Sequence, residues 1–286
     1  MGFGFVEVGS ITPNPQDGNP RPRVWRLDSE NAVMNCYGFN SQGHEACRPR
    51  IGAYHTNPRR KGVFGINLGK NKTSESDTAD YVLGVRRLGR FADYLVINVS
   101  SPNTPGLRNL QHEKRLLELL LQVKAARDEI TSECDRMIPL LVKIAPDVTD
   151  TELASIADVI VKSKVDGVII SNTTISRPPR IKEIELQETM KGGLSGEPVK
   201  ELSTSVISKF YHLTRGKVPI IGVGGVQTGQ DAYDKIKAGA SLVQLYSSMA
   251  LHGPQIVSQV KQELATLLEK DGCTSISQAI GASHRQ

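Results

Sequence analysis

The sequence lacks the patterns that mark membrane-spanning, metal-binding and nucleic-acid-binding proteins. No apolar stretch approaches the ~20 residues that span a bilayer, and the first residues show no charged region followed by an apolar one, as a secretory signal would. The 4 cysteines form no CxxC pair and the 6 histidines no HExxH motif, so we predict reduced thiols and no metal site. Despite a net charge of +5, no Lys/Arg run is long enough to bind nucleic acid, and we expect no nucleic-acid partner.

The sequence does contain an alternation of strand-like and helix-like segments. Its 286 residues suffice for one large domain, and 38% hydrophobic with 23% charged residues is typical of a globular protein. Apolar residues recur at helical spacing over 112–130, 149–161, 202–213 and 230–237. Short apolar runs, which predict strands, lie at 5–9, 63–69, 94–100, 140–146, 167–174, 218–225 and 241–247.

Local signals support the ends of three of these helices. Thr149 and Glu152 have the spacing of a capping box, which predicts the start of a helix. Gly216 and Gly239 follow two of the periodic segments directly, as C-terminal capping glycines do.

Strands that alternate with helices predict a parallel sheet joined by right-handed crossovers. The runs are almost continuously apolar, as expected for strands that are covered on both faces. An open doubly wound sheet is the alternative, but the first strand–helix turn lacks GxGxxG, which weakens its dinucleotide-binding version. The last two strands end in Gly224-Gly225 and Tyr246-Ser247, and in a barrel the corresponding loops often hold a phosphate. We therefore favour a barrel.

A closed barrel of this type has eight strand–helix units, and only seven are visible. The segment 20–60 is rich in Pro, Gly, Asn and Arg, and we interpret it as a long functional loop rather than a strand. The first strand opens near Phe5, almost at residue 1. We predict an α/β (β/α)8 TIM barrel, one domain over residues 1–286, with the first strand–helix unit missing from its N-terminus.

Polar residues at the C-terminal ends of barrel strands face a shared pocket. Side-chain amides supply both hydrogen-bond donors and acceptors, which suits a flat ligand with amide and carbonyl groups. Any single Asn could merely cap a strand or turn, but this explanation is hard to hold for four at equivalent positions. The strand-end candidates are Asn67, Asn98, Ser101, Asn103, Lys143, Asn172, Thr173, Gly225 and Tyr246.

Lys143 and a glycine-rich loop point to an anionic or electron-rich ligand. Lys143 lies within an apolar strand, where a buried ammonium needs either a structural carboxylate or a ligand, and we favour the ligand. In the stretch 222–225, the glycines let backbone N–H groups approach an anion without an obstructing Cβ. A Gly pair alone is usually a tight turn, so it supports a phosphate site only together with the last strand.

Several stretches resemble the dihydroorotate dehydrogenase family, and the similarity runs from residue 2 to about residue 284. The resemblance implies an FMN-binding barrel that oxidises dihydroorotate to orotate in pyrimidine (UMP) biosynthesis. Ser101, in a motif N-x-S-[CS]-P-N, is similar to class 2, the membrane-associated branch that passes electrons to a quinone such as ubiquinone. The matching stretches are GSITPNPQDGNPRPR (9–23), NCYGFNSQG (35–43), GINLGKNK (65–72), NVSSPNTPGLR (98–108), VKIAPD (142–147), SNTT (171–174), GGLSG (192–196), PIIGVGG (219–225) and ASLVQLYS (240–247).

The resemblance also implies roles for single residues. Ser101 is expected to be the base that takes a proton from C5 of the substrate while a hydride leaves C6, and Thr104 and Phe39 match positions that relay the proton through water. The implied cofactor residues are Ser10, Asn67, Asn98, Lys143, Ser171, Gly196, Gly225, Tyr246 and Ser247. The implied substrate residues are Asn35, Cys36, Tyr37, Gly38, Phe39, Asn98, Asn103, Asn172 and Thr173.

Class 2 members also carry a first strand with a nearby Lys that contacts FMN, and N-terminal helices that form the quinone tunnel and the membrane attachment. These 286 residues contain neither, and we expect this chain alone to be poorly stable, to bind FMN weakly and not to reduce quinone. By resemblance, the expected location is the mitochondrial inner membrane.

Two other functions stay open at this point. The chain could be an inactive fragment or a pseudoenzyme that acts only through interaction. It could also be another phosphate-binding barrel enzyme, such as an aldolase-like lyase with Lys143 as a Schiff-base nucleophile.

Overall fold

The computed structural model describes residues 2–177, 181 and 190–285. Its main element is a seven-stranded parallel sheet in the order β1-β4-β5-β6-β7-β9-β10, and each strand coincides with one of the apolar runs, which confirms all seven. The strands are β1 (Phe5–Ile11), β4 (Val63–Leu68), β5 (Tyr94–Asn98), β6 (Leu140–Ile144), β7 (Gly167–Ile170), β9 (Ile220–Val223) and β10 (Leu242–Gln244).

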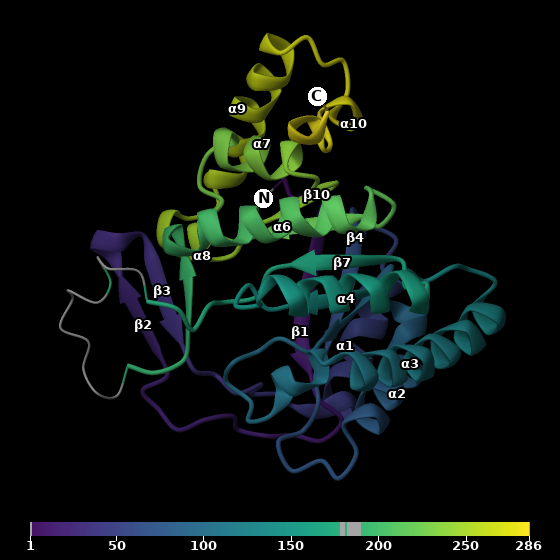
Figure 1. Cartoon of the computed structure of the whole chain (residues 1–286). Coiled ribbons are helices and arrows are strands. Elements are labelled where there is room, and N and C mark those ends of the chain that lie inside the picture. The colour runs from purple at the N-terminus through teal and green to yellow at the C-terminus, as the bar shows by residue number, and fades with distance from the viewer. Residues whose placement is uncertain (1, 178–180, 182–189, 286) are drawn as a thin grey trace.

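Helices follow the strands along the chain and pack side by side around the outside of the sheet (Figure 1). Successive helices α2, α3, α4, α6 and α7 each contact the next, and α9 packs on α7. The helices are α1 (Gly43–His55), α2 (Asp77–Leu88), α3 (Glu113–Cys134), α4 (Asp150–Ser163), α6 (Lys200–Thr214), α7 (Gly229–Lys237), α8 (Ser247–His252), α9 (Ile256–Lys270) and α10 (Ile276–Ala279). Among the described helices, none is both long and apolar enough to cross a bilayer.

The strands bury side chains on both faces, as their continuous apolar runs predict. Leu95 and Ile97 of β5 point outward into the main core between sheet and helices. Tyr94 and Val96 of the same strand point inward into a smaller cluster, together with Ile169 of β7. This arrangement, a curved parallel sheet with an inner and an outer core, fits the predicted α/β barrel class.

The predicted helix ends are confirmed at three places. The Thr149 side chain accepts from the Glu152 N–H, and the Glu152 carboxylate accepts from the Thr149 N–H, so the capping box is formed. Gly216 and Gly239 both have positive φ, +66° and +124°, just after α6 and α7. A side chain at Gly239 would also collide with the Tyr211 ring, since an added Cβ would lie 2.4 Å from it.

The interpretation of 20–60 as a loop is wrong. The segment contains β2 (Val24–Leu27), β3 (Ala32–Asn35) and α1. The two strands form an antiparallel hairpin, and β3 pairs on its other side with β8 (Gly193–Gly196). These strands have only four residues each, and their partner β8 is far away in sequence. No long local run of apolar residues therefore predicts them.

Within the described residues, β1 and β10 form the two edges of the main sheet. The side chains of these edges meet, because Gln244 Nε2 of β10 donates to Glu7 Oε2 of β1 at 3.0 Å. That a further strand–helix unit belongs to this barrel stays a prediction.

His44, at the start of α1, is expected to make folding sensitive to acid. Its ring is fully buried, and neither ring nitrogen has a partner among the described residues. Burial, with a smaller contribution from the Arg87 charge, lowers the pKa of His44 from 6.5 to about 4. The folded state therefore holds the ring neutral while the unfolded chain takes up a proton, and stability falls as the pH drops from about 6.5 to about 4.

We expect this loss to amount to about 3 kcal/mol, which His44→Leu should abolish. Urea unfolding at pH 7, 5.5 and 4.5 measures it, with exposed His252 replaced in the same way as the control. An equal acid dependence in His44→Leu and the unsubstituted chain would contradict the assignment.

Candidate active site

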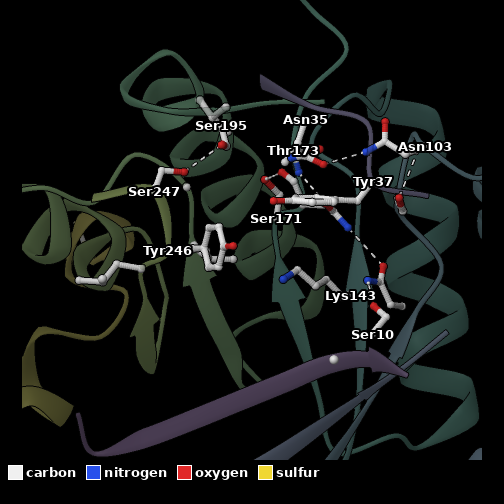
Figure 2. A pocket seen from close by; sticks show the side chains of 18 of the residues that line it. Ser10, Asn35, Tyr37, Asn103, Lys143, Ser171, Thr173, Ser195, Tyr246 and Ser247 are labelled. Carbon is white, nitrogen blue, oxygen red and sulfur yellow. Dashed lines mark hydrogen bonds between the residues drawn. The ribbon is translucent and has the colours of Figure 1, made fainter. Parts of the chain in front are cut away.

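The polar strand ends meet in one cavity of about 470 Å³ at the C-terminal edge of the parallel sheet (Figure 2). Parallel strands end on the same side, so residues far apart in the sequence converge there. Most of the predicted site residues line this cavity: Ser10, Asn35, Tyr37, Gly38, Phe39, Asn98, Ser101, Asn103, Lys143, Ser171, Asn172, Thr173, Gly225, Tyr246 and Ser247.

A row of side-chain amides runs beneath the cavity. The group at one end of the row determines which atom of each amide donates and which accepts. The carboxylate of Glu7 accepts from Asn67 Nδ2 at 2.8 Å, so Asn67 Oδ1 faces the opposite way. That oxygen accepts from Asn98 Nδ2 at 3.3 Å and from the Ser10 hydroxyl. Asn98 Oδ1 in turn accepts from Asn172 Nδ2 at 3.2 Å. Because a carboxylate can only accept, every amide in the row has one defined orientation.

A second pair of amides lies beside Ser101. Asn103 Nδ2 donates to Asn35 Oδ1 at 3.1 Å, which joins the loop after β5 to the end of β3. The Asn103 N–H donates to Ser101 Oγ at 3.3 Å. Ser101 is itself only 7% exposed and lines the cavity. Its hydroxyl oxygen thus lies in a nearly dry, hydrogen-bonded position.

Lys143 extends from β6 into the cavity, and its side-chain amine has no hydrogen bond or ion pair with any described residue. No carboxylate in that part of the chain therefore pairs with Lys143, as the alternative of a salt bridge inside the barrel would require. Figure 2 shows its amine reaching toward the space beside Tyr246. An ammonium held in a cavity without a partner favours an electron-rich or anionic ligand there.

The far side of the cavity is a polar backbone loop. Gly224 and Gly225 both line it with positive φ, +123° and +71°. A Cβ at Gly225 would lie 2.5 Å from Lys200 Cβ, so the loop cannot carry a side chain at this position without a shift. Beside this loop, Ser247 Oγ donates to Ser195 Oγ at 2.8 Å, which brings two hydroxyls to the same region.

Four of the predicted residues do not line the cavity. Asn67 lies behind Asn98 in the amide row, Gly196 packs against the Asn31 carbonyl, and Cys36 is held outside with a pKa raised by burial. Thr104 is 4% exposed, and its hydroxyl oxygen has no partner among the described residues.

Nine lining residues are not among the predicted site residues: Gly9, Asn40, Ser195, Val199, Val223, Gly224, Val226, Leu245 and Ser248. Ser195 lies in the glycine-rich stretch 192–196, and Ser248 follows Ser247 directly. Gly9 and Asn40 lie within the stretches 9–23 and 35–43 that resemble the family, so they too could have been included.

An ion pair holds the walls of the cavity together from behind. Arg108 Nη1 and Asp147 Oδ2 are 2.8 Å apart, and the arginine also donates to the carbonyl of Thr173 at 2.9 Å. Burial alone would raise the pKa of Asp147, but hydrogen bonds from Thr174, from the Ile175 N–H and from Arg108 hold it below its usual range. The carboxylate thus stays charged and ties together the loops after β5, β6 and β7.

Comparison with known proteins gives a consistent result. The sequence model of the family described as dihydroorotate dehydrogenase matches residues 1–268. The chain is 52% identical to the mitochondrial dihydroorotate dehydrogenase (quinone) of Arabidopsis thaliana, covering 100% of this chain and 66% of that protein. It is 53% identical to the mouse protein of the same name, covering 100% and 72%, and 50% identical to the dihydroorotate dehydrogenase (quinone) of Rhodospirillum rubrum, covering 100% and 76%.

The fold agrees with these similarities. A crystal structure of DHODH (dihydroorotate dehydrogenase) from Eimeria tenella in complex with ferulenol superposes with a TM-score of 0.93 and 43% identity, covering 100% of this chain and 80% of that one. The chain spans less than two thirds of the length of the Arabidopsis relative. Sequence and fold together show that this chain belongs to the dihydroorotate dehydrogenase family.

Proposed function

We propose that this chain is the catalytic barrel of a quinone-linked dihydroorotate dehydrogenase, which oxidises dihydroorotate to orotate in pyrimidine biosynthesis. The observation that carries the proposal is the shared cavity, which is lined by Ser101, by Asn98 and Asn172 of the amide row and by Lys143. The aldolase-like alternative has no comparable support, since no feature of the cavity requires a Schiff base.

The residues present fit FMN as the cofactor. The cavity volume of about 470 Å³ is in the range of ~300–1,000 Å³ that holds a small-molecule ligand. The backbone at Gly225 and the hydroxyls of Ser195 and Ser247 would hold the phosphate. Lys143 and the amide of Asn98 would contact the flavin ring. When bound, FMN supplies an acceptor for one hydride, that is, one proton together with two electrons.

The substrate would lie against Asn35, Asn98, Asn103 and Asn172, whose amides match its ring carbonyl and N–H groups. Oxidation removes a proton from C5 and a hydride from C6, and the two electrons left between these carbons form the double bond of orotate. Ser101 would take the C5 proton. To act as a base, the hydroxyl must give up its own proton as it takes the C5 proton. The N–H of Asn103, which donates to Ser101 Oγ, would stabilise the negative charge left by that loss.

Thr104 is the candidate residue for passing the proton on from Ser101. Its buried hydroxyl oxygen has no protein partner among the described residues, although a buried polar atom normally has one. A water beside this hydroxyl would satisfy it and connect Ser101 to solvent. Phe39 lines the cavity, and its ring packs against the backbone at Gly69.

The final acceptor and the location follow from the relatives. Because those from Arabidopsis, mouse and Rhodospirillum are named as quinone enzymes, we infer that a quinone such as ubiquinone reoxidises the cofactor here. The plant and mouse proteins are named as mitochondrial, which supports a mitochondrial location. Attachment to the inner membrane through a region N-terminal to this chain is part of the same proposal.

Flavin spectroscopy tests the proposal directly. At saturating FMN the purified protein should be yellow, and anaerobic dihydroorotate should bleach this colour as it reduces on the order of one flavin per chain. A colourless protein that does not take up FMN would refute it. Trapping of a carbonyl substrate on Lys143 by borohydride would support the lyase instead.

Replacement of Lys143 by methionine is expected to weaken FMN binding ~10- to 100-fold, because a charge-assisted hydrogen bond is lost. Riboflavin, which lacks the phosphate, should be weakened by the same factor if Lys143 contacts the ring. Fluorescence titration of the apoprotein measures both affinities, and Lys162→Met, on the exposed face of α4, is the matched control. Unchanged affinity for both flavins would remove Lys143 from the cofactor site.

A further inference from the structure

Lys235 of α7 is a buried charge that the proposed reaction does not use. Its side chain is fully buried. The ammonium donates to Ser203 Oγ at 2.6 Å, to Thr204 Oγ1 at 2.9 Å and to the carbonyl of Lys200 at 3.4 Å. All three acceptors belong to the first turn of α6. No carboxylate in the described part of the chain lies within ion-pair distance of it.

The first turn of α6 lies directly behind the glycine loop. Ser203 Oγ accepts from the Lys235 ammonium, and its single proton is shared between the carbonyl oxygens of Lys200 at 3.0 Å and Gly224 at 3.2 Å. The Gly224–Gly225 peptide bond is trans, so its N–H points away from its carbonyl. The Gly224 carbonyl faces α6, and both glycines line the cavity. The Gly225 N–H is therefore directed to the cavity, and it donates to no described residue.

The charge on Lys235 is poorly compensated. Asp231 is nearby, but its carboxylate is paired with Lys200 Nζ at 3.1 Å. Burial lowers the pKa of Lys235 to about 7, against the opposing charges of Asp231 and Glu201. Lys200 lowers it further, and Asp234 raises it.

The other elements packed on α7 add few charged groups near the ammonium. From α9, Glu263 accepts from the Gly229 N–H at 2.6 Å. From the C-terminal turn, His284 contacts the Ala238 carbonyl at 3.2 Å. An added anion at the glycine loop would thus be the main new partner for Lys235.

We propose that Lys235 is a positioning residue for the cofactor phosphate: through Ser203 it orients the Gly225 N–H into the cavity, and its ammonium is the buried counter-charge of the phosphate. This inference rests on the proposed binding of FMN. It assigns a role to a side chain that never touches the ligand and lies one layer behind the loop that does.

Comparison of FMN with riboflavin isolates the phosphate. In Lys235→Met, which keeps the length of the side chain, FMN should bind about tenfold more weakly while riboflavin binding is unchanged, since only FMN carries the anion. Lys237→Met is the matched control, because it removes the same charge from the same helix, where the amine lies over the Tyr233 ring. Equal weakening of both flavins, or of neither, would overturn the proposal.

The pH dependence gives a signature that mere packing would not. A bound phosphate favours the charged ammonium and raises the pKa of Lys235 above its value of about 7 in the apoprotein. The ratio of FMN to riboflavin affinity should therefore fall about tenfold from pH 7 to pH 9 in the unsubstituted protein. It should be flat over this range in Lys235→Met and unaffected by Lys237→Met. A flat ratio in the unsubstituted protein would overturn the counter-charge role.

Ser203→Ala tests the hydroxyl connection even if Lys235→Met fails to fold. This substitution should weaken FMN binding severalfold and leave riboflavin binding unchanged. The ratio of the two affinities should still depend on pH, because the ammonium remains. Unchanged FMN affinity in Ser203→Ala would remove the orienting role. If the unsubstituted protein binds FMN and riboflavin equally, this inference fails while flavin binding stands; if it binds neither, the proposed function fails.

Discussion

Replacement of Ser101 by alanine is expected to slow reduction of the bound flavin by dihydroorotate by about 10²–10⁴-fold while FMN stays bound, because a positioned base is removed. Ser101 Oγ lies in the cavity with a hydrogen bond from the Asn103 N–H, but makes no contact that holds the glycine loop. The rate of flavin reduction should therefore fall, and the affinity for FMN should stay unchanged.

Stopped-flow measurement of flavin bleaching under anaerobic conditions gives this rate separately from reoxidation by quinone. Ser101→Cys is the informative companion, since a thiol with an ordinary pKa near 8.5 ionises far more readily than a hydroxyl. It should recover part of the rate with a pH profile displaced to lower pH. Ser205→Ala, on the exposed face of α6, controls for a general effect of losing a serine. Bleaching of Ser101→Ala at the unsubstituted rate would exclude Ser101 as the base.

The parallel sheet could be predicted from the sequence because its physical signal is local. A strand covered on both faces must be apolar at nearly every position, and Tyr94–Asn98 or Leu140–Ile144 show this directly. The antiparallel sheet could not be predicted, because Val24–Leu27 is short, partly exposed and paired only with Ala32–Asn35, which pairs in turn with the distant Gly193–Gly196. Their apolar residues form a small separate core around Met34 and Leu194, which exists only after folding.

The part of the site that lies at the strand ends could be predicted, because the topology of the sheet alone determines its position. Parallel strands end on one edge, so Asn98, Lys143 and Asn172 had to converge once the strands were found. The layer behind them could not be predicted. Glu7 interrupts an apolar strand, and Lys235 is one of two lysines near the end of a helix. Only the packing of α7 on α6 shows which groups Lys235 contacts, and only the pairing of β1 with β4 shows which groups Glu7 contacts.

The same layer contains the second substitution with a large expected effect, Asp147→Ala. The Asp147 carboxylate accepts from Arg108 Nη1, from the Ile175 N–H at 3.0 Å, from Ser176 Oγ at 3.0 Å and from the Thr174 hydroxyl. Arg108, with 21% of its side chain exposed, would be left without its counter-charge. Removing one partner of a largely buried, hydrogen-bonded pair costs about 3 kcal/mol, and we expect that loss in the free energy of unfolding.

The substitution should also loosen the cavity, because Arg108 bonds to the carbonyls of Ser100 and Thr173 on its two walls. We expect orotate affinity to fall at least tenfold, since the amide of Asn172 and the hydroxyl of Ser101 then lose their fixed separation. Urea unfolding and orotate titration measure the two effects. Asp158→Ala is the control, because that carboxylate is 75% exposed on α4, and such changes usually stay within about 0.5 kcal/mol.

Acid titration then identifies the carboxylate as the cause. The pKa of Asp147 is held below its unfolded value, so its contribution to stability is fully present above about pH 4 and is lost as the pH falls through the lowered folded value. Below that value, the stability difference between Asp147→Ala and the unsubstituted chain should be smaller than the difference of about 3 kcal/mol at pH 7. Equal stability and equal orotate affinity at pH 7 would show that the loops are held by other contacts and that Asp147 is dispensable.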